Sequence, residues 1–280
     1  MPKRNWLPIL IKILSLPKMP KKKPVVALVS LSCCEGCLFA IFDLHERFFS
    51  LVKDYAEIGE SQITRETFGK GPYDIAIVEG TPITKGNIQV LKEVRKRSKI
   101  LIALGDCATH GCVQSIKNYV DKEKAIKHVY KDRKGIDNPD IKPIKDFVKV
   151  DYEILGCPVN AEEFMEAFLE LREGRMPKAP TPRSVCYECQ EREIECLLQQ
   201  GEACLGPAII GGCGATCPEA KYRCEGCRGV IKDNPGLLNF VKQLKKVATQ
   251  KEINHILEKF GIRKEWEEEI NKRKEKKNEI

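Results

Sequence analysis

The sequence predicts an open, doubly wound α/β domain with a parallel sheet, followed by a small irregular cysteine-rich domain and a charged helical C-terminal tail. Three observations support this fold class. Continuous apolar runs alternate with amphipathic patterns over roughly the first 175 residues, as in a sheet covered by helices on both faces. Cysteine, glycine and proline dominate from Pro177 to Arg228, and the chain beyond Asn234 is charged with helical periodicity.

The first strand is expected at Val25 to Leu31, an apolar run that ends at a Cys-Cys-Glu-Gly-Cys turn. Leu38 to Val52 has apolar residues at helical spacing with charged residues between them, which predicts an amphipathic helix. A second strand is expected within Tyr55 to Phe68, although turn residues mark its ends poorly.

The alternation then becomes regular. Strands are predicted at Asp74–Val78, Lys99–Leu104 and Phe147–Leu155, and helices at about Gly86–Arg97 and Ala161–Glu173. We expect a flavodoxin-like strand order for this domain. The predicted organisation is a basic extension over residues 1–24, the flavodoxin-like domain over 25–180, a cysteine-rich domain over 181–232 and a helical tail over 233–280.

The net charge of +8 is concentrated at the N-terminus, where residues 1–23 hold seven lysines and arginines and no acid. The rest of the chain is nearly neutral and has no basic stripe with interleaved aromatic residues, which argues against nucleic-acid binding. No apolar stretch reaches the roughly 18 residues of a membrane span. The apolar run from Trp6 to Leu16 has no small-residue cleavage site after it. We therefore expect a retained extension and a cytoplasmic protein.

Four cysteines of the first domain follow predicted strands: Cys34 and Cys37 after the first, Cys107 after Leu104, and Cys157 after Leu155. The carboxyl ends of parallel strands lie on one edge of a sheet, so these thiols are expected to meet there. Four thiolates suit zinc or an iron–sulfur cluster. A structural zinc more often uses two close cysteine pairs, so the wide spacing favours a redox centre. Unrelated buried cysteines are the alternative.

Eight of the 14 cysteines lie between Cys186 and Cys227. They suffice for two sites with four thiolates each, and two zinc ribbons are the alternative. A sequential partition is the simplest, although interleaved ligands remain open. It gives one group of Cys186, Cys189, Cys196 and Cys204, and another of Cys213, Cys217, Cys224 and Cys227. Cys33 and Cys112 are left over.

An ordered set of short motifs between about Val25 and Gly229 resembles the small subunit of nickel–iron hydrogenases. The motifs are Leu31–Cys37, Val78–Gly80, Gly105–Ala108, Gly156–Pro158, Cys204–Pro207 and Cys224–Cys227. The pattern is most similar to the cytoplasmic archaeal type with three clusters, such as sulfhydrogenase delta subunits and deazaflavin-reducing or heterodisulfide-reductase-linked hydrogenases.

The resemblance implies three 4Fe–4S clusters. It assigns Cys34, Cys37, Cys107 and Cys157 to the proximal cluster, Cys213, Cys217, Cys224 and Cys227 to the medial one, and Cys186, Cys189, Cys196 and Cys204 to the distal one. It also implies an electron-relay role and a large subunit that carries the nickel–iron active site. A further flavin or iron–sulfur subunit would accept the electrons. This chain would hold no catalytic residue of its own.

Residues near the expected ligands have open roles. Glu79 could join a proton path or accept hydrogen bonds from loop N–H groups. Cys112 could lie beside the proximal cluster or serve as a small buried hydrophobe, and Arg228 could offset cluster charge or face solvent. His110 is expected to be a surface residue or to stand behind the ligands. A complex I-related subunit is one alternative function, although that family has only the first cluster. A zinc-binding interaction module is the other.

Overall fold

The computed structural model describes residues 23–61, 71–132, 134–136, 139–177 and 182–278. The N-terminal extension lies outside this part of the chain, apart from its last two residues. Five parallel strands form one sheet in the order β2-β1-β3-β4-β5, which confirms the flavodoxin-like prediction. The strands are β1 (Val25–Ser30), β2 (Glu57–Ser61), β3 (Tyr73–Glu79), β4 (Ser98–Leu104) and β5 (Tyr152–Ile154).

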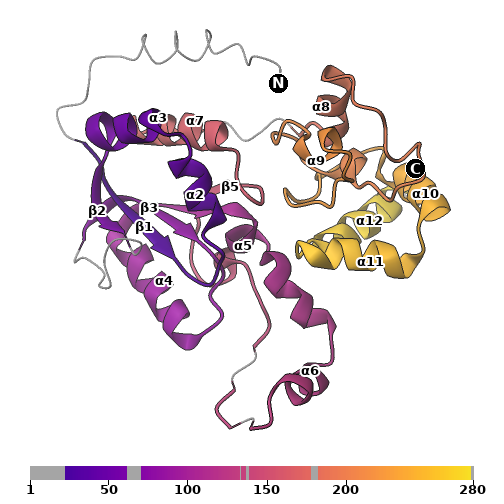
Figure 1. Cartoon of the computed structure of the whole chain (residues 1–280), viewed down its shortest axis with the longest axis horizontal. Helices are drawn as coiled ribbons and strands as arrows, with labels where there is room; N and C mark the ends of the chain where they lie inside the picture. The colour runs from indigo at the N-terminus through magenta and orange to yellow at the C-terminus, as the bar shows by residue number, and fades with distance from the viewer. Residues whose placement is uncertain (1–22, 62–70, 133, 137–138, 178–181, 279–280) are drawn as a thin grey trace.

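Both faces of the sheet are covered, as the continuous apolar strands predict (Figure 1). On one face, α2 (Gly36–Phe42) and α7 (Ala161–Arg172) pack against alternate strand residues such as Leu28 and Ile77. On the other face, α4 (Lys85–Arg97) packs through Leu91 against the intervening residues. The helix α4 begins at Thr84 with a capping box, so its start is fixed by local sequence as well as by packing.

Two predicted elements differ from the structure. The helix expected over Leu38–Val52 is broken into α2, α3 (Glu46–Ser50) and a π-helical turn at Leu51–Tyr55. His45 adopts a positive φ of 52° at the break, and the rings of Phe42 and Phe48 pack 4.7 Å apart across it. The break therefore lets aromatic residues from two short helices reach the same core.

The predicted strand Phe147–Leu155 is reduced to Tyr152–Ile154. A carboxylate oxygen of Asp151 accepts a hydrogen bond from the Leu101 N–H at 2.9 Å, and the Asp151 N–H donates to the Leu101 carbonyl at 2.9 Å. The side chain thus replaces a ladder partner, and the preceding residues, including Val148 and Val150, pack against the core without joining the sheet.

The cysteine-rich segment and the helical tail share one apolar core. The described residues of the segment form α8 (Val185–Glu191), α9 (Thr216–Glu219) and a short 3-10 turn at Gly206–Ala208. Its buried residues pack against α10 (Leu237–Val247), α11 (Gln250–Lys259) and α12 (Arg263–Asn278). Trp266 of α12 is buried in this core, so the predicted charged terminal helix is present and packs one face against the cysteine-rich segment.

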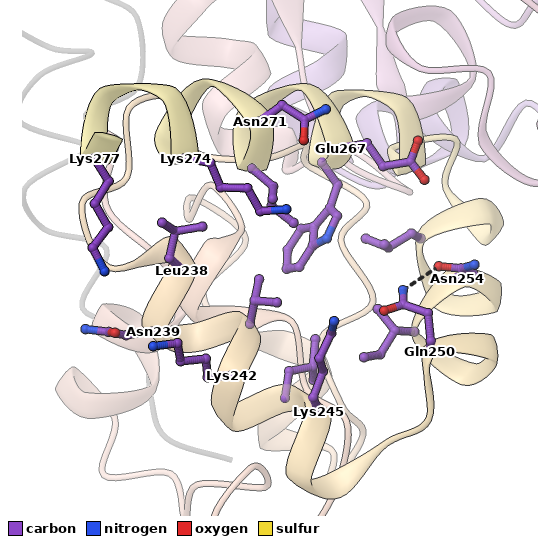
Figure 2. Close-up of a pocket in the computed structure, with 16 residues that line it drawn as sticks. Leu238, Asn239, Lys242, Lys245, Gln250, Asn254, Glu267, Asn271, Lys274 and Lys277 are labelled. Carbon is purple, nitrogen blue, oxygen red and sulfur yellow. Dashed lines mark hydrogen bonds between the residues drawn. The ribbon is translucent and has the colours of Figure 1, made fainter. Parts of the chain in front are cut away.

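The three tail helices border an open groove of about 660 Å³ (Figure 2). Apolar residues such as Leu244 and Trp266 line it together with the rim lysines Lys242, Lys245 and Lys274. Within the described ranges, no helix is long and apolar enough to cross a membrane.

Candidate metal centres

The loops after β1, β4 and β5 meet at the carboxyl edge of the sheet. The Asp106 N–H donates to the Gly156 carbonyl at 2.9 Å, which joins the Cys107 loop to the Cys157 loop. A Cβ atom at Gly105 would overlap the sulfur of Cys37. Gly105 also has a positive φ of 80°, so glycine is needed there both for backbone conformation and for space. The structure thus brings loops that are remote in sequence to one edge.

Glu79 fixes the first of these loops. Its buried carboxylate accepts hydrogen bonds from the N–H groups of Cys37 and Leu38, each at 3.1 Å. These donors belong to the first turn of α2, where the N–H groups have no helical partner and favour a negative charge. Burial raises the pKa of this carboxyl, while the two N–H bonds oppose the rise. Of the two roles considered for Glu79, the structure therefore shows that of a hydrogen-bond acceptor for loop N–H groups.

Cys112 lies among the predicted proximal ligands. It is buried and has a positive φ of 49°. Its thiol donates to the Cys157 sulfur at 3.8 Å, and its hydrogen bond with Cys107 is the main cause of its raised pKa. These contacts place Cys112 beside the predicted proximal site rather than in a separate apolar core.

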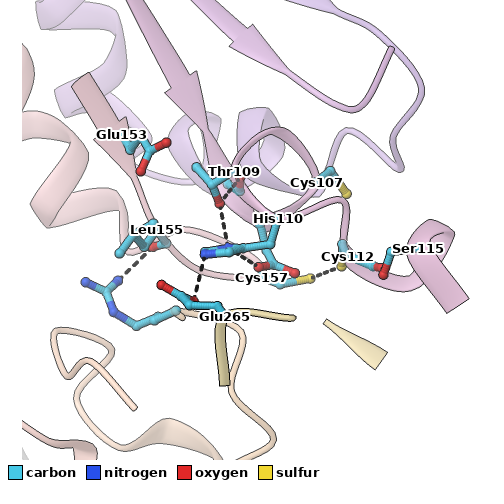
Figure 3. A network of polar contacts seen from close by, with 12 residues as sticks. Cys107, Thr109, His110, Cys112, Ser115, Glu153, Leu155, Cys157 and Glu265 are labelled. Carbon is cyan, nitrogen blue, oxygen red and sulfur yellow. Dashed lines mark hydrogen bonds and ion pairs between the residues drawn. The ribbon is translucent and has the colours of Figure 1, made fainter. Parts of the chain in front are cut away.

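A buried polar network lies behind this edge (Figure 3). The His110 ring shares a hydrogen bond of 2.9 Å with Asp106, and its other nitrogen is 3.7 Å from Glu265 of α12. Thr109 is 3.0 Å from the same ring nitrogen that faces Asp106. His110 is thus not a surface residue, and its contacts connect the sheet domain to the helical tail.

The thiols predicted for the distal site are close enough to influence one another. Burial, together with the neighbouring thiols Cys204, Cys189 and Cys196, raises the pKa of Cys186 to about 12. A Cβ at Gly206 would lie 3.3 Å from the Cys186 sulfur and 3.5 Å from the Cys204 sulfur. The backbone therefore passes directly beside two thiols of this group.

The thiols predicted for the medial site lie next to that group. Burial raises the pKa of Cys224, with further contributions from Cys204, Cys227 and Cys213. The Cys224 N–H donates to the Cys204 sulfur at 3.3 Å, and burial raises the pKa of Cys227 to about 12. No three His, Cys, Asp or Glu side chains within the described ranges form a chelate for a single metal ion. The division into three ligand sets remains a prediction.

Charged side chains behind the ligand loops were not all found from sequence. Arg228 is fully buried and forms an ion pair with Glu163 of α7, so it does not face solvent. Glu188, between Cys186 and Cys189, accepts from the N–H groups of Gly212 at 2.6 Å and Ala215 at 3.1 Å. No local signal marks Glu163, whereas the position of Glu188 within a Cys-x-x-Cys pair could have suggested a structural role.

Comparison with known proteins gives a consistent result. The family of the NADH ubiquinone oxidoreductase 20 kDa subunit matches residues 34–171. The sulfhydrogenase 2 subunit delta of Pyrococcus furiosus is 38% identical over 220 residues, which cover 76% of this chain and 90% of the relative. A vhu F420-non-reducing hydrogenase protein of Methanocaldococcus jannaschii is 33% identical, over 73% of this chain and 81% of the relative.

Solved structures agree with the fold. An NAD+-reducing NiFe hydrogenase in the H2-reduced state aligns with a TM-score of 0.50 and 29% identity, over 57% of this chain and 97% of that chain. A NiFeSe hydrogenase of Dm. baculatum aligns with a TM-score of 0.55 over 74% of this chain and 94% of that chain, at 15% identity. This second likeness supports the fold alone.

A parallel sheet with cysteine loops at its carboxyl edge, matched by the 20 kDa subunit family, defines a class of redox subunits. Within this class, the hydrogenase relatives match a longer part of the chain than that family does, and they show which family it belongs to. The chain belongs to the small subunits of nickel–iron hydrogenases. It is therefore an oxidoreductase subunit with an electron-relay role.

Proposed function

We propose that this chain holds three 4Fe–4S clusters and relays single electrons between the nickel–iron site of a large subunit and a further redox subunit. The observation that carries the proposal is the meeting of the Cys34, Cys37, Cys107 and Cys157 loops at one sheet edge, next to a compact region with eight more cysteines. Thiolate is the ligand that iron–sulfur clusters use, and when bound such clusters accept and release one electron at a time.

The residues present fit such groups. Glycines stand where a side chain would collide with a ligand sulfur, as at Gly105 and Gly206. Burial raises the pKa of most of the predicted ligand thiols, so they hold their protons until a metal displaces them. Glu79 and Glu188 hold the ligand loops through backbone N–H groups. The protein's task is to fix the spacing and surroundings of the ligands.

The large subunit is proposed to cover the carboxyl edge of the sheet. Cys34 and Cys157 are exposed there. Phe39, just after Cys37, is 55% exposed, and Val113, just after Cys112, is 50% exposed. Apolar side chains of this size beside exposed thiols are typical of a surface that a partner buries. We expect an interface of more than about 2,000 Å², in the range of permanent complexes.

The further subunit, a flavin or iron–sulfur protein, is proposed to bind near the distal ligand set. Cys196 is exposed, and so is Tyr187 beside Cys186. An exposed ligand at this end would leave a short path to an external acceptor. We also propose a cytoplasmic location, where free thiols remain reduced and available for metal.

Metal analysis of the anaerobically purified complex tests the cofactor assignment. We expect about twelve iron and twelve acid-labile sulfide per small subunit, after subtraction of the iron of the large subunit. About three zinc ions without sulfide would support the zinc module instead and end the relay proposal.

Replacement of Cys227 with serine separates relay from catalysis. A serine oxygen is a poorer ligand for iron than thiolate, so Cys227→Ser is expected to disturb the medial cluster. Proton–deuterium exchange should persist while dihydrogen-driven reduction of the physiological acceptor falls sharply. Cys33→Ser is the matched control, because Cys33 is assigned to no ligand set. Equal loss of both activities at unchanged nickel content would contradict the relay assignment.

A further inference from the structure

Arg228 is the largest of the fully buried side chains in the described part of the chain, with 1% exposure. Every nitrogen of its guanidinium group has a partner. Nε donates to the Gly211 carbonyl at 2.8 Å, and Nη1 donates to the Leu155 carbonyl at 2.7 Å. Nη1 and Nη2 also bind the two carboxylate oxygens of Glu163 at 2.8 and 3.0 Å. Only the planar guanidinium group of arginine can make such paired, bidentate hydrogen bonds, and the ammonium group of lysine cannot reproduce them.

These bonds join loops that belong to two predicted ligand sets. Leu155 precedes the proximal ligand Cys157 by two residues, and Gly211 precedes the medial ligand Cys213 by two residues. Arg228 itself follows the medial ligand Cys227 directly. One guanidinium group therefore connects the backbone of the proximal site to the backbone of the medial site.

Two neighbouring residues, Gly212 and Asn160, support this connection. A Cβ at Gly212 would lie 2.5 Å from Nη2 of Arg228, and Gly212 has a φ of 111°. Glycine at this position lets the guanidinium group reach its partners. The Asn160 side chain adds a second bond between the same two regions, because its amide donates to the Gly212 carbonyl at 3.0 Å.

The charge of Arg228 is as notable as its bonds. Glu163 neutralises it in part, but the Glu163 side chain is 22% exposed whereas that of Arg228 is 1% exposed. Water therefore screens the carboxylate more than the guanidinium. The thiols of Cys213 and Cys227 are close enough to interact electrostatically with Arg228. A buried positive charge at this place stabilises any negative charge that is added nearby.

We propose that Arg228 is a positioning residue which fixes the spacing between the proximal and medial clusters and favours reduction of the medial one. This inference rests on the proposed function, since it presumes clusters at those two ligand sets. Electron transfer weakens steeply with distance, so a rigid link between the two sets keeps the step efficient. The same guanidinium group stabilises an added electron at the medial site, against the carboxylates of Glu163 and Glu188, which lie at the same loops.

Three variants of the assembled complex separate spacing from charge. Arg228→Gln removes the positive charge and some of the hydrogen bonds. Arg228→Lys keeps the charge but loses the bidentate hydrogen bonds. Glu163→Gln removes the opposing negative charge. Arg192→Gln is the matched control, because Arg192 lies in the same region and binds the Gly214 carbonyl and Glu219 at the surface. The readouts are a potentiometric titration of the medial EPR signal and the magnetic splitting between the two reduced clusters.

In Arg228→Gln, the ratio of reduced to oxidised medial cluster at a fixed potential should fall about tenfold, a shift of ~59 mV for one electron. In Glu163→Gln, the ratio should change in the opposite direction. Arg228→Lys should alter the magnetic splitting, which depends on cluster spacing, and leave the ratio within about threefold of wild type. Arg192→Gln should change neither quantity. Shifts of opposite sign cannot arise from a merely structural role.

Unchanged ratios in Arg228→Gln and Glu163→Gln, with intact clusters, would overturn the charge assignment. Unchanged splitting in Arg228→Lys would overturn the spacing assignment. If Arg228→Gln does not assemble, the other two variants still decide each point. Absence of iron–sulfur signals from the wild-type complex would instead refute the proposed function, so the two failures are distinguishable.

Discussion

Glu79 allows a direct test of how the fold holds the proximal loop. Its carboxylate is 1% exposed and accepts two backbone N–H groups, those of Cys37 and Leu38. Glu79→Gln keeps one oxygen acceptor but turns an NH2 group toward the second N–H. One buried donor then loses its partner, while the shape of the side chain is almost unchanged.

The loss of folding free energy in Glu79→Gln can be estimated from its two hydrogen bonds. A buried donor without a partner costs about 1–3 kcal/mol. The remaining bond changes from charge-assisted to neutral, which loses about 1 kcal/mol more. Burial opposes the charged form of Glu79, as the raised pKa shows, and the neutral amide recovers part of that penalty. We therefore expect a net loss of about 2 kcal/mol, and a lower melting temperature.

Thermal melting of the assembled complex, followed by the charge-transfer absorbance of the clusters, measures this loss. Asp121→Asn is the matched control, because Asp121 accepts the Lys124 N–H at 3.1 Å at an exposed helix start, where the same exchange should cost less than about 0.5 kcal/mol. Glu79→Asp should also melt early, because its shorter side chain cannot reach both N–H groups. A Glu79→Gln complex that melts like wild type but loses proton–deuterium exchange would refute this reasoning and favour the proton-path role.

Three further predictions concern the rest of the chain. Gly212→Ala should destabilise the protein by about 1–3 kcal/mol from backbone strain and more from collision with Arg228, whereas Gly201→Ala, with a φ of 91° and no atom near its Cβ position, should show the strain alone in a melting experiment. Thr249→Ala removes the capping box of α11 and should cost about 1 kcal/mol in the same assay; no change would contradict the cap. Hydrogen bonds from Lys276 and Lys272 lower the pKa of Asp233 from 3.8 to about 2, so its stabilising effect is complete above pH 3.8 and is lost as the pH falls toward 2. A carboxyl NMR titration should show the pKa of Asp233 rising toward 3.8 in Lys276→Gln, and an unchanged value would contradict the assigned cause.

The strands of the sheet could be predicted because burial on both faces gives continuous apolar runs, as in β1 and β3. The flavodoxin-like strand order, expected from the strand–helix alternation, is confirmed. The cysteine loops meet because the carboxyl ends of parallel strands lie on one edge of the sheet. The packing of the C-terminal helices against the cysteine-rich segment could not be predicted from the sequence. The cysteine-rich segment has few apolar residues of its own, and its core is completed by Leu237, Leu244 and Trp266 from the tail helices. Local periodicity does not reveal such a long-range partner.

The sequence left two roles open for Arg228 and gave no signal for Glu163, for a similar reason. The two residues are 65 positions apart and meet only because the N-terminal turn of α7 contacts the cysteine-rich region. In sequence, Arg228 is one of many charged residues beside a cysteine, and exposure is the usual state of an arginine. Only the fold shows that its partners are Leu155 and Gly211, one from each ligand loop.

The two neighbouring ligand sets differ in their permanently charged groups: among the described residues, only the medial loops hold a buried arginine, and it is opposed there by Glu163 and Glu188. Glu79 and Asp106 are the buried carboxyls beside the proximal loops, and burial raises the pKa of both. Whether ionised or protonated, neither adds positive charge. Arg228 does so at the medial loops, and it remains charged under all conditions in which proteins are folded. Arg228 therefore favours an added electron at the proposed medial set, against the carboxylates of Glu163 and Glu188 at the same loops. This is the direction required if electrons enter from the large subunit proposed at the sheet edge and leave through the further subunit proposed beyond the cysteine-rich region.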